Sequence, residues 1–149
     1  MSDEGTQEET EPQPKPLFWI ASSQDDLRSF PEDVKDTMGF ALYQAQMGGK
    51  HVAAKPLQGF GGAGILEIVE DYQGSTFRGV YTVKFAGALY VLDAFQKKSK
   101  KGVKTPARDI NRLKNRLRAA EEHYQRWSVA RRKEKNHGKN KKRGPGTEK

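Results

Sequence analysis

The sequence lacks cysteine and has no long apolar stretch among its 149 residues. Without cysteine, a disulfide framework and a thiolate metal site are excluded. The apolar runs are far shorter than the roughly 20 residues that span a bilayer, and the acidic N-terminus, Met1-Ser2-Asp3-Glu4, has no apolar signal core. This length fits one small domain and excludes a multidomain enzyme, so we expect a soluble, cytoplasmic protein that does not bind membranes.

Positive charge is concentrated in the last third of the chain. Residues 1–16 have a net charge of −4, residues 17–95 of −3 and residues 96–149 of +15, which gives the formal net charge of +8. This distribution is typical of proteins that bind polyanions, so nucleic acid is the first partner to consider. The alternative for the last twenty residues is a solvated tail that binds RNA without specificity.

Composition divides the chain into three parts. Residues 1–16 contain five acids, three prolines and one apolar residue, Met1, while residues 130–149 are dominated by Lys, Asn and Gly. Neither segment has enough apolar surface to offset the entropy of folding. We therefore expect a disordered acidic leader, a folded domain over residues 17–129 and a disordered basic tail.

Hydrophobic periodicity predicts an α+β domain in the order β-α-α-β-β-β-α. A strand at residues 17–20 is followed by two helices, the second from Pro31 to Gly48. A long amphipathic helix over residues 106–127 ends the domain. Between them lie three strand-like segments joined by short turns, at residues 65–71, 76–85 and 88–96. We expect a small, mostly antiparallel sheet with helices packed on one face.

A set of basic residues is suited to phosphate. Arg78 alternates with Phe77 in the middle strand, which predicts that it lies on an open, cationic face of the sheet. Lysines follow the last strand at positions 97, 98, 100, 101 and 104. Arg108, Arg112 and Arg116 line one face of the final helix, where a solvated surface is the simpler interpretation. Arginine can hold a phosphodiester through paired hydrogen bonds, and lysine adds neutralising charge.

RNA can be cut without a metal ion because its own 2′-hydroxyl is the nucleophile. The protein must orient that hydroxyl, stabilise the charge of the transition state and transfer protons. Arg78, Lys97 and Lys98 are candidates for charge stabilisation, and Lys55 and His51 for proton transfer. For His51, a solvated loop histidine is the alternative interpretation.

Other catalytic motifs are absent or lack their structural context. Residues 59–64 match the pattern G-x-G-x-x-G, but they precede a predicted strand, which argues against a dinucleotide site. The three histidines, His51, His123 and His137, lack the spacing of metal ligands, and there is no nucleophile elbow or P-loop. We therefore expect no metal and no cofactor.

Several segments form a recognisable combination. They are KPLQGFG at 55–61, LEI at 66–68, TFRGVY at 76–81, VLDAFQKKS at 91–99 and KTP at 104–106. With the order of elements, they resemble the RelE/ParE superfamily of bacterial toxins, in the HigB-like branch that includes phage-derived relatives. The resemblance implies a toxin of a type II toxin-antitoxin system that enters the ribosome and cleaves mRNA, held inactive by a cognate antitoxin.

The resemblance also implies roles for single residues. Arg78 occupies the position of a sheet arginine that binds the scissile phosphate, and Lys97 and Lys98 match basic residues after the last strand. His51 and Lys55 lie in the loop before the second predicted strand, which HigB-like members use. That strand carries glutamates where RelE-type relatives have lysines, so no general base is assigned.

Further basic residues are candidates for RNA binding beside the catalytic set: Lys84, Lys100, Lys101, Lys104 and Arg108. Two alternatives remain open. One is a ParE-like inhibitor of a protein target such as DNA gyrase, because one fold can carry different functions. The other is a non-catalytic, phage-derived protein that binds nucleic acid.

Overall fold

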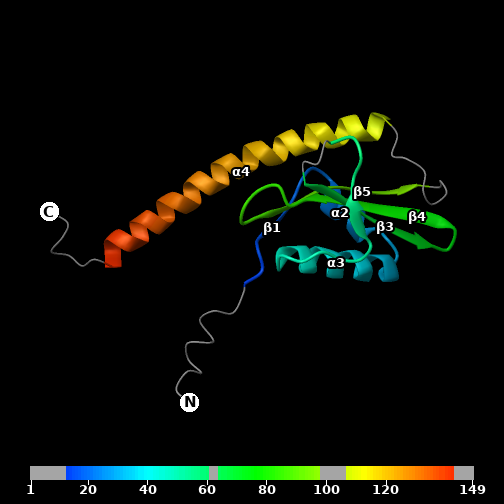
Figure 1. Ribbon diagram of the computed structural model, residues 1–149, viewed down its shortest axis with the longest axis horizontal. Coiled ribbons are helices and arrows are strands. Elements are labelled where there is room, and N and C mark those ends of the chain that lie inside the picture. Colours follow the sequence, from blue (N-terminus) through cyan, green and yellow to red (C-terminus); the bar gives the residue numbers. More distant parts are fainter. Residues whose placement is uncertain (1–12, 61–63, 98–106, 143–149) are drawn as a thin grey trace, which may run out of the picture.

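The computed structural model describes residues 13–60, 64–97 and 107–142. The α+β class is confirmed (Figure 1). In chain order the elements are β1 (Leu17–Trp19), α2 (Ser23–Arg28), α3 (Glu32–Gln46), β2 (Ala54–Pro56), β3 (Ile65–Tyr72), β4 (Ser75–Thr82), β5 (Leu89–Lys97) and α4 (Ala107–Lys142). The short strand β2 is additional to the predicted order, because three residues that end in proline give no readable alternation.

The strands form one mixed sheet in the order β1-β5-β4-β3-β2. Strand β1 runs parallel to β5, with Leu17 opposite Leu89, whereas the other pairings are antiparallel. The prediction of a mostly antiparallel sheet therefore needs correction at β1. Short turns fix the antiparallel direction of consecutive strands, but no such turn links β1 to β5.

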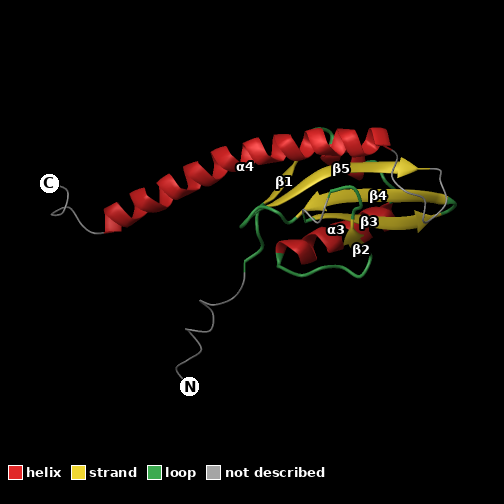
Figure 2. Ribbon diagram, turned by 45° about the horizontal axis from the view of Figure 1, so that its top comes forward, coloured by secondary structure: helices red, strands yellow, loops and turns green. Residues whose placement is uncertain are grey.

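Helices cover both faces of the sheet, so the prediction that they share one face is wrong (Figure 2). Helices α2 and α3 pack on one face, and the first half of α4 packs on the other. Strand β5 shows the reason, because Leu89 and Val91 belong to the core beneath α3, while Tyr90 and Leu92 belong to the core beneath α4. A sheet that is apolar on both faces needs a layer of helices on each side.

A bulge in β5 changes which side chains face α4. Val80 lies opposite Asp93 and Tyr81 lies opposite Val91, so Leu92 is the extra residue. Leu92 packs in the core beneath α4, and Asp93 binds arginines of the same helix. The bulge therefore presents two consecutive residues to one helix, which regular alternation forbids.

Helix α4 is longer than predicted. It runs from Ala107 to Lys142, so residues 130–142 are helical instead of the disordered chain that their composition predicts. Extension of an existing helix needs no new nucleation step, and Arg, Lys and Glu are good helix formers. The remainder of the predicted tail and residues 1–12 of the predicted leader lie outside the described residues. None of the described helices has the combined length and apolar character of a membrane span.

Candidate functional site

A polar groove of about 730 Å³ lies along the second half of β5. Strand β1 pairs with β5 only as far as Val91, which leaves the rest of β5 without a strand neighbour on that side within the described chain. The groove is lined by side chains from the end of α2, the start of β4, β5 and the first turns of α4. These include Asp26, Ser29, Phe30, Ser75, Asp93, Phe95, Gln96, Arg112 and Arg116.

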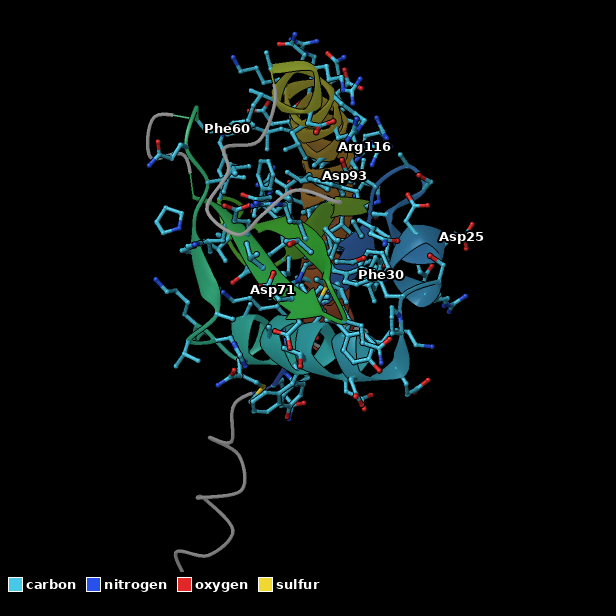
Figure 3. All side chains as sticks on the ribbon, turned by 90° about the vertical axis from the view of Figure 1, so that its right-hand side faces the viewer. Asp25, Phe30, Phe60, Asp71, Asp93 and Arg116 are labelled. Atoms are coloured by element: carbon cyan, nitrogen blue, oxygen red, sulfur yellow. The ribbon has the colours of Figure 1, made fainter. Side chains whose placement is uncertain are left out.

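Asp93 holds two arginines in this groove. The residue is 2% exposed, and its Oδ2 accepts a hydrogen bond from Nε of Arg112 at 2.8 Å. Its Oδ1 accepts bonds from Nη1 of Arg116 at 2.8 Å and from the backbone N–H of Ala94 at 2.9 Å. Figure 3 labels Asp93 and Arg116 next to each other, between α4 and the sheet. The carboxylate therefore fixes the position of both guanidinium groups.

Helix α4 brings Arg112 and Arg116 to one carboxylate because residues four apart lie on the same helical face. Arg112 also binds Oδ1 of Asp109 at 2.9 Å, and Nη1 of Arg116 donates to the Leu92 carbonyl at 3.0 Å. Burial lowers the pKa of Arg112, but the hydrogen bonds and charges of Asp93 and Asp109 outweigh it and raise the pKa overall. The Arg112 guanidinium is therefore held in its charged form next to that of Arg116.

These guanidinium groups retain donors for a ligand. A guanidinium has several N–H donors in a fixed planar arrangement, which can match two oxygens of a phosphate. Within the described part of the chain, the hydrogen bonds of Arg112 and Arg116 use Nε and Nη1 but not Nη2. The two aspartates offset the charge of the two arginines, so donor geometry rather than net charge distinguishes the site.

Aromatic rings line the same groove. The guanidinium of Arg112 lies 5.6 Å from the ring centre of Phe95, and the Phe30 and Phe77 rings meet edge to face at 4.9 Å. Rings beside cationic donors are the elements with which proteins bind single-stranded nucleic acid, through base stacking and phosphate contacts. Phe30 and Phe77 are only 7% and 4% exposed and belong to the core, whereas Phe95 is partly exposed beside Arg112.

Arg78 does not lie on an open face, and the prediction that it does is wrong. The residue is 3% exposed, and its Nη1 binds Oε1 of Glu67 at 2.8 Å. Glu67 is itself 8% exposed and lies opposite Val80, so it is a diagonal neighbour of Arg78 across β3 and β4. Alternation gives the face of a residue, but the partner depends on strand register, which the sequence does not show.

The structure separates two residues that sequence reasoning grouped. Lys55 is exposed and lies directly opposite Glu67 in the β2–β3 pair, on the face that also carries Arg78. His51 lies toward the opposite face, where its ring contacts Phe40 of α3 at 5.8 Å between ring centres. Nδ1 of His51 also accepts the backbone N–H of Ala53 at 2.9 Å.

The remaining candidates do not form one cluster within the described chain. Lys97 ends β5, opposite Thr76 and next to the groove residue Gln96. Arg108 is exposed in the first turn of α4, and Nζ of Lys84 pairs with Glu121 at 3.1 Å. The other predicted lysines lie outside the described residues, and they are Lys98, Lys100, Lys101 and Lys104.

Sequence reasoning missed Asp93 and assigned Arg112 and Arg116 to a solvated surface. A signal was present, because Arg108, Arg112 and Arg116 recur every four residues, with an acidic residue inside the last apolar strand. A charge in an apolar strand requires a partner, and the arginine row of the following helix supplies one.

Comparison with known proteins identifies the family. Residues 25–118 match the family model described as Phage derived protein Gp49-like (DUF891). The match spans more than half of the chain, so this α+β protein belongs to the Gp49-like family of phage-derived proteins. The matched region includes the groove and ends within the first half of α4.

No curated protein matches the sequence. Among solved structures, the chain is similar to one in the toxin-antitoxin complex RelBE2 from Mycobacterium tuberculosis, at 15% identity and a TM-score of 0.39. That similarity covers 58% of this chain and 94% of the other.

Proposed function

We propose that the protein is the toxin of a type II toxin-antitoxin system, of the HigB-like branch of RelE relatives, and that it cleaves mRNA on the ribosome without a metal ion. Membership in the Gp49-like family supports the proposal, as does the resemblance of residues 76–81 and 91–99 to RelE/ParE toxins. The observation that carries it is the pair of arginines, Arg112 and Arg116, held one turn apart in a groove beside the basic end of β5.

The proposed reaction uses the nucleophile of the RNA itself. The 2′-oxygen bonds to the adjacent phosphorus, and the bond from phosphorus to the 5′-oxygen of the next nucleotide breaks. The products are a 2′,3′-cyclic phosphate and a 5′-hydroxyl, with one proton removed from the 2′-hydroxyl and one supplied to the leaving oxygen. Donors aimed at the non-bridging oxygens stabilise the charge that develops there.

In this scheme Arg112 and Arg116 bind the scissile phosphate through their outer N–H groups. Asp93 is a positioning residue, because it holds both guanidinium groups without facing the phosphate itself. Lys97, the last residue of β5, and Lys98, which follows it in the sequence, add positive charge that favours RNA binding. The reaction further requires that the groove hold one splayed nucleotide with its 2′-hydroxyl in line with the leaving oxygen.

Arg78 has a supporting role in the proposal, and His51 has none. The buried pair of Arg78 with Glu67 holds β3 and β4 together, and Lys55 adds an exposed charge opposite Glu67. His51 contacts α3 instead. The proposed partners are the ribosome with its mRNA and a cognate antitoxin that blocks the groove.

A cell-free translation reaction with a defined mRNA tests the proposal. Primer extension maps the new 5′ ends made by the wild type, Arg112→Gln and Arg116→Gln, with Arg118→Gln as the matched control. Arg118 is an exposed arginine of the same helix that interacts with Asn115 and lies outside the groove. Loss of one transition-state donor reduces cleavage by about 100-fold or more, whereas the control keeps the wild-type rate.

Thermal unfolding of each variant separates a loss of chemistry from a loss of fold. Cuts that require translating ribosomes and disappear in the folded groove variants are the expected result. If the folded wild type makes no cuts, the endonuclease proposal fails. A supercoiling assay would then test inhibition of DNA gyrase, the alternative target class.

A further inference from the structure

The second half of α4 leaves the domain. Apolar contacts between this helix and the sheet end with Tyr124 and Trp127. Beyond them the helix projects away from the sheet, and no other helix or strand of the described chain lies beside it (Figures 1 and 2). The projecting arm, defined here as residues 128–142, is about 22 Å long at 1.5 Å per residue. Every residue from 129 to 135 is exposed.

Positive charge dominates this arm. Residues 128–142 contain seven Lys or Arg and one acidic residue, Glu134. Arg131, Lys135 and Lys139 recur every four positions, one helical turn apart. Like charges at this spacing repel each other and destabilise a helix, and a polar helix without packing partners is only marginally stable. A ligand that neutralises the row would therefore stabilise the arm as it binds.

The arm starts from a fixed base. The guanidinium of Arg131 lies 5.1 Å from the ring centre of Trp127, which is packed in the core beneath α4. Because α4 continues without a break from the groove to Lys142, the arm has a set direction relative to Arg116. The distance along the helix from Arg116 to Arg131 is about 22 Å. A ligand on the arm is therefore a different stretch of polymer from one in the groove.

The composition of the arm selects among classes of partner. A protein interface needs an apolar centre, and an interfacial membrane helix needs an apolar face. Residues 128–142 offer only Val129 and Ala130 as apolar side chains. A phosphate backbone needs only cationic donors, which the arm has in high density.

We propose that the projecting arm of α4, residues 128–142, is a binding site for the phosphate backbone of a polynucleotide, separate from the groove. The arm lies beyond residue 118, where the match to the Gp49-like family model ends. Its contribution is affinity and electrostatic steering, because a regular row of lysines and arginines reads backbone charge and not base sequence. The proposal does not depend on cleavage, since the arm needs no chemistry in the groove.

Binding of a labelled oligonucleotide to the full chain, followed by fluorescence anisotropy at increasing KCl concentrations, tests the arm. The probe is 2′-O-methyl RNA, in which the nucleophile is blocked, so the readout is binding alone. The arm variant replaces four exposed basic residues by Gln, which keeps helix propensity, and these are Arg131, Arg132, Lys133 and Lys135. The control variant makes the same change in net charge at four exposed residues elsewhere, which are Arg28, Lys50, Lys114 and Arg118.

The salt dependence provides the quantitative prediction. For a single strand, each lost phosphate contact lowers the slope of log K against log salt by about 0.7. The arm variant therefore loses up to about 3 in slope and at least about tenfold in affinity at moderate salt, while the control stays within about twofold. Equal loss in the arm and control variants, or no loss in the arm variant, overturns the proposal.

Probes of different type identify the source of the backbone. Single-stranded DNA and duplexes of the same sequence are compared with the RNA probe. Preference for RNA assigns the arm to RNA, and equal binding of all probes assigns it to phosphate backbones in general. Both results support the arm as a polynucleotide site, whereas displacement of the probe by an acidic polypeptide at equal charge concentration contradicts it.

Discussion

Replacement of Asp93 by Asn removes the charge that holds the groove together while it keeps the size of the side chain. The carboxylate is buried and accepts hydrogen bonds from Arg112, Arg116 and the backbone of Ala94. Asparagine offers one acceptor oxygen, and its amide group places N–H donors against a guanidinium that is also a donor. We therefore expect Asp93→Asn to destabilise the domain and to release at least one arginine.

The magnitude follows from the exposure of the two partners. Hydrogen bonds to charged groups contribute about 1.5–3 kcal/mol each. The Arg116 side chain is only 17% exposed, so its hydrogen bond to Asp93 contributes close to the full amount. The Arg112 side chain is 37% exposed, so solvent weakens its hydrogen bond to Asp93. The expected loss is about 3 kcal/mol in the free energy of unfolding. For a chain of this size that lowers the melting temperature by about 10 °C.

Urea unfolding measures both the loss in the free energy of unfolding and the coupling energy between Asp93 and Arg116. The proteins compared are the wild type, Asp93→Asn, Arg116→Gln and the double variant. Because both single variants break the same contact, the double variant is less destabilised than their sum by about 1–2 kcal/mol. Glu121→Gln is the control, since Glu121 forms an exposed pair with Lys84 and contributes less than about 1 kcal/mol. Additive effects, or a loss below 1 kcal/mol for Asp93→Asn, would refute the reasoning.

Three further predictions concern stability. Arg78→Ala leaves the carboxylate of Glu67 buried without its 2.8 Å partner and lowers the unfolding free energy by about 3 kcal/mol, and an unchanged urea midpoint would count against a structural role for the pair. Burial raises the pKa of Tyr90 to about 12 from its usual value of 10, so its stabilising contribution is complete below pH 10 and is lost as the pH rises toward 12. Between those pH values the wild type loses about 2 kcal/mol relative to Tyr90→Phe in urea melts, and parallel pH profiles would contradict this. Leu113 is a fully buried residue of α4, and its replacement by Ala lowers the free energy of unfolding by about 2–5 kcal/mol. A smaller loss in thermal melts would show that α4 is not part of the core.

Local signals predicted a large part of the fold. The Gln73-Gly74 turn, in which both residues have positive φ angles of 50° and 83°, joins β3 and β4 as an antiparallel hairpin, as predicted. The residues of the apolar stripe in the predicted final helix pack in the core beneath α4, and they are Ile110, Leu113, Leu117, Ala120, Tyr124 and Trp127. Both features depend on residues close together in sequence, where periodicity and turn chemistry act directly.

Features that depend on distant residues were not predictable in this way. Strand β1 pairs with β5, which lies far from it in the sequence, and nothing in residues 17–20 specifies that neighbour or its direction. Strand β5 is apolar on both faces, which periodicity alone cannot distinguish from a strand with one buried face. The mixed sheet and its two helical layers follow from these contacts.

The candidate site shows the same division. Composition predicted a basic segment after the last strand. Lys97 is instead the last residue of β5, next to the groove residue Gln96, and the other lysines of the segment lie outside the described residues. The burial of Arg78 depends on Glu67 through strand register, and the role of Asp93 depends on a bulge. Neither register nor bulge leaves a distinct mark in a single sequence.

The central claim is that the 2′-hydroxyl of mRNA attacks the phosphate bound by Arg112 and Arg116. The most direct test is a translation reaction with two mRNAs that differ by a single 2′-deoxynucleotide immediately 5′ of a mapped cut. The account predicts that the unmodified mRNA is cut to a 2′,3′-cyclic phosphate and a 5′-hydroxyl end, and that the modified mRNA is intact at that position. Cleavage of both mRNAs at the same site, or 5′-phosphate ends, would contradict it.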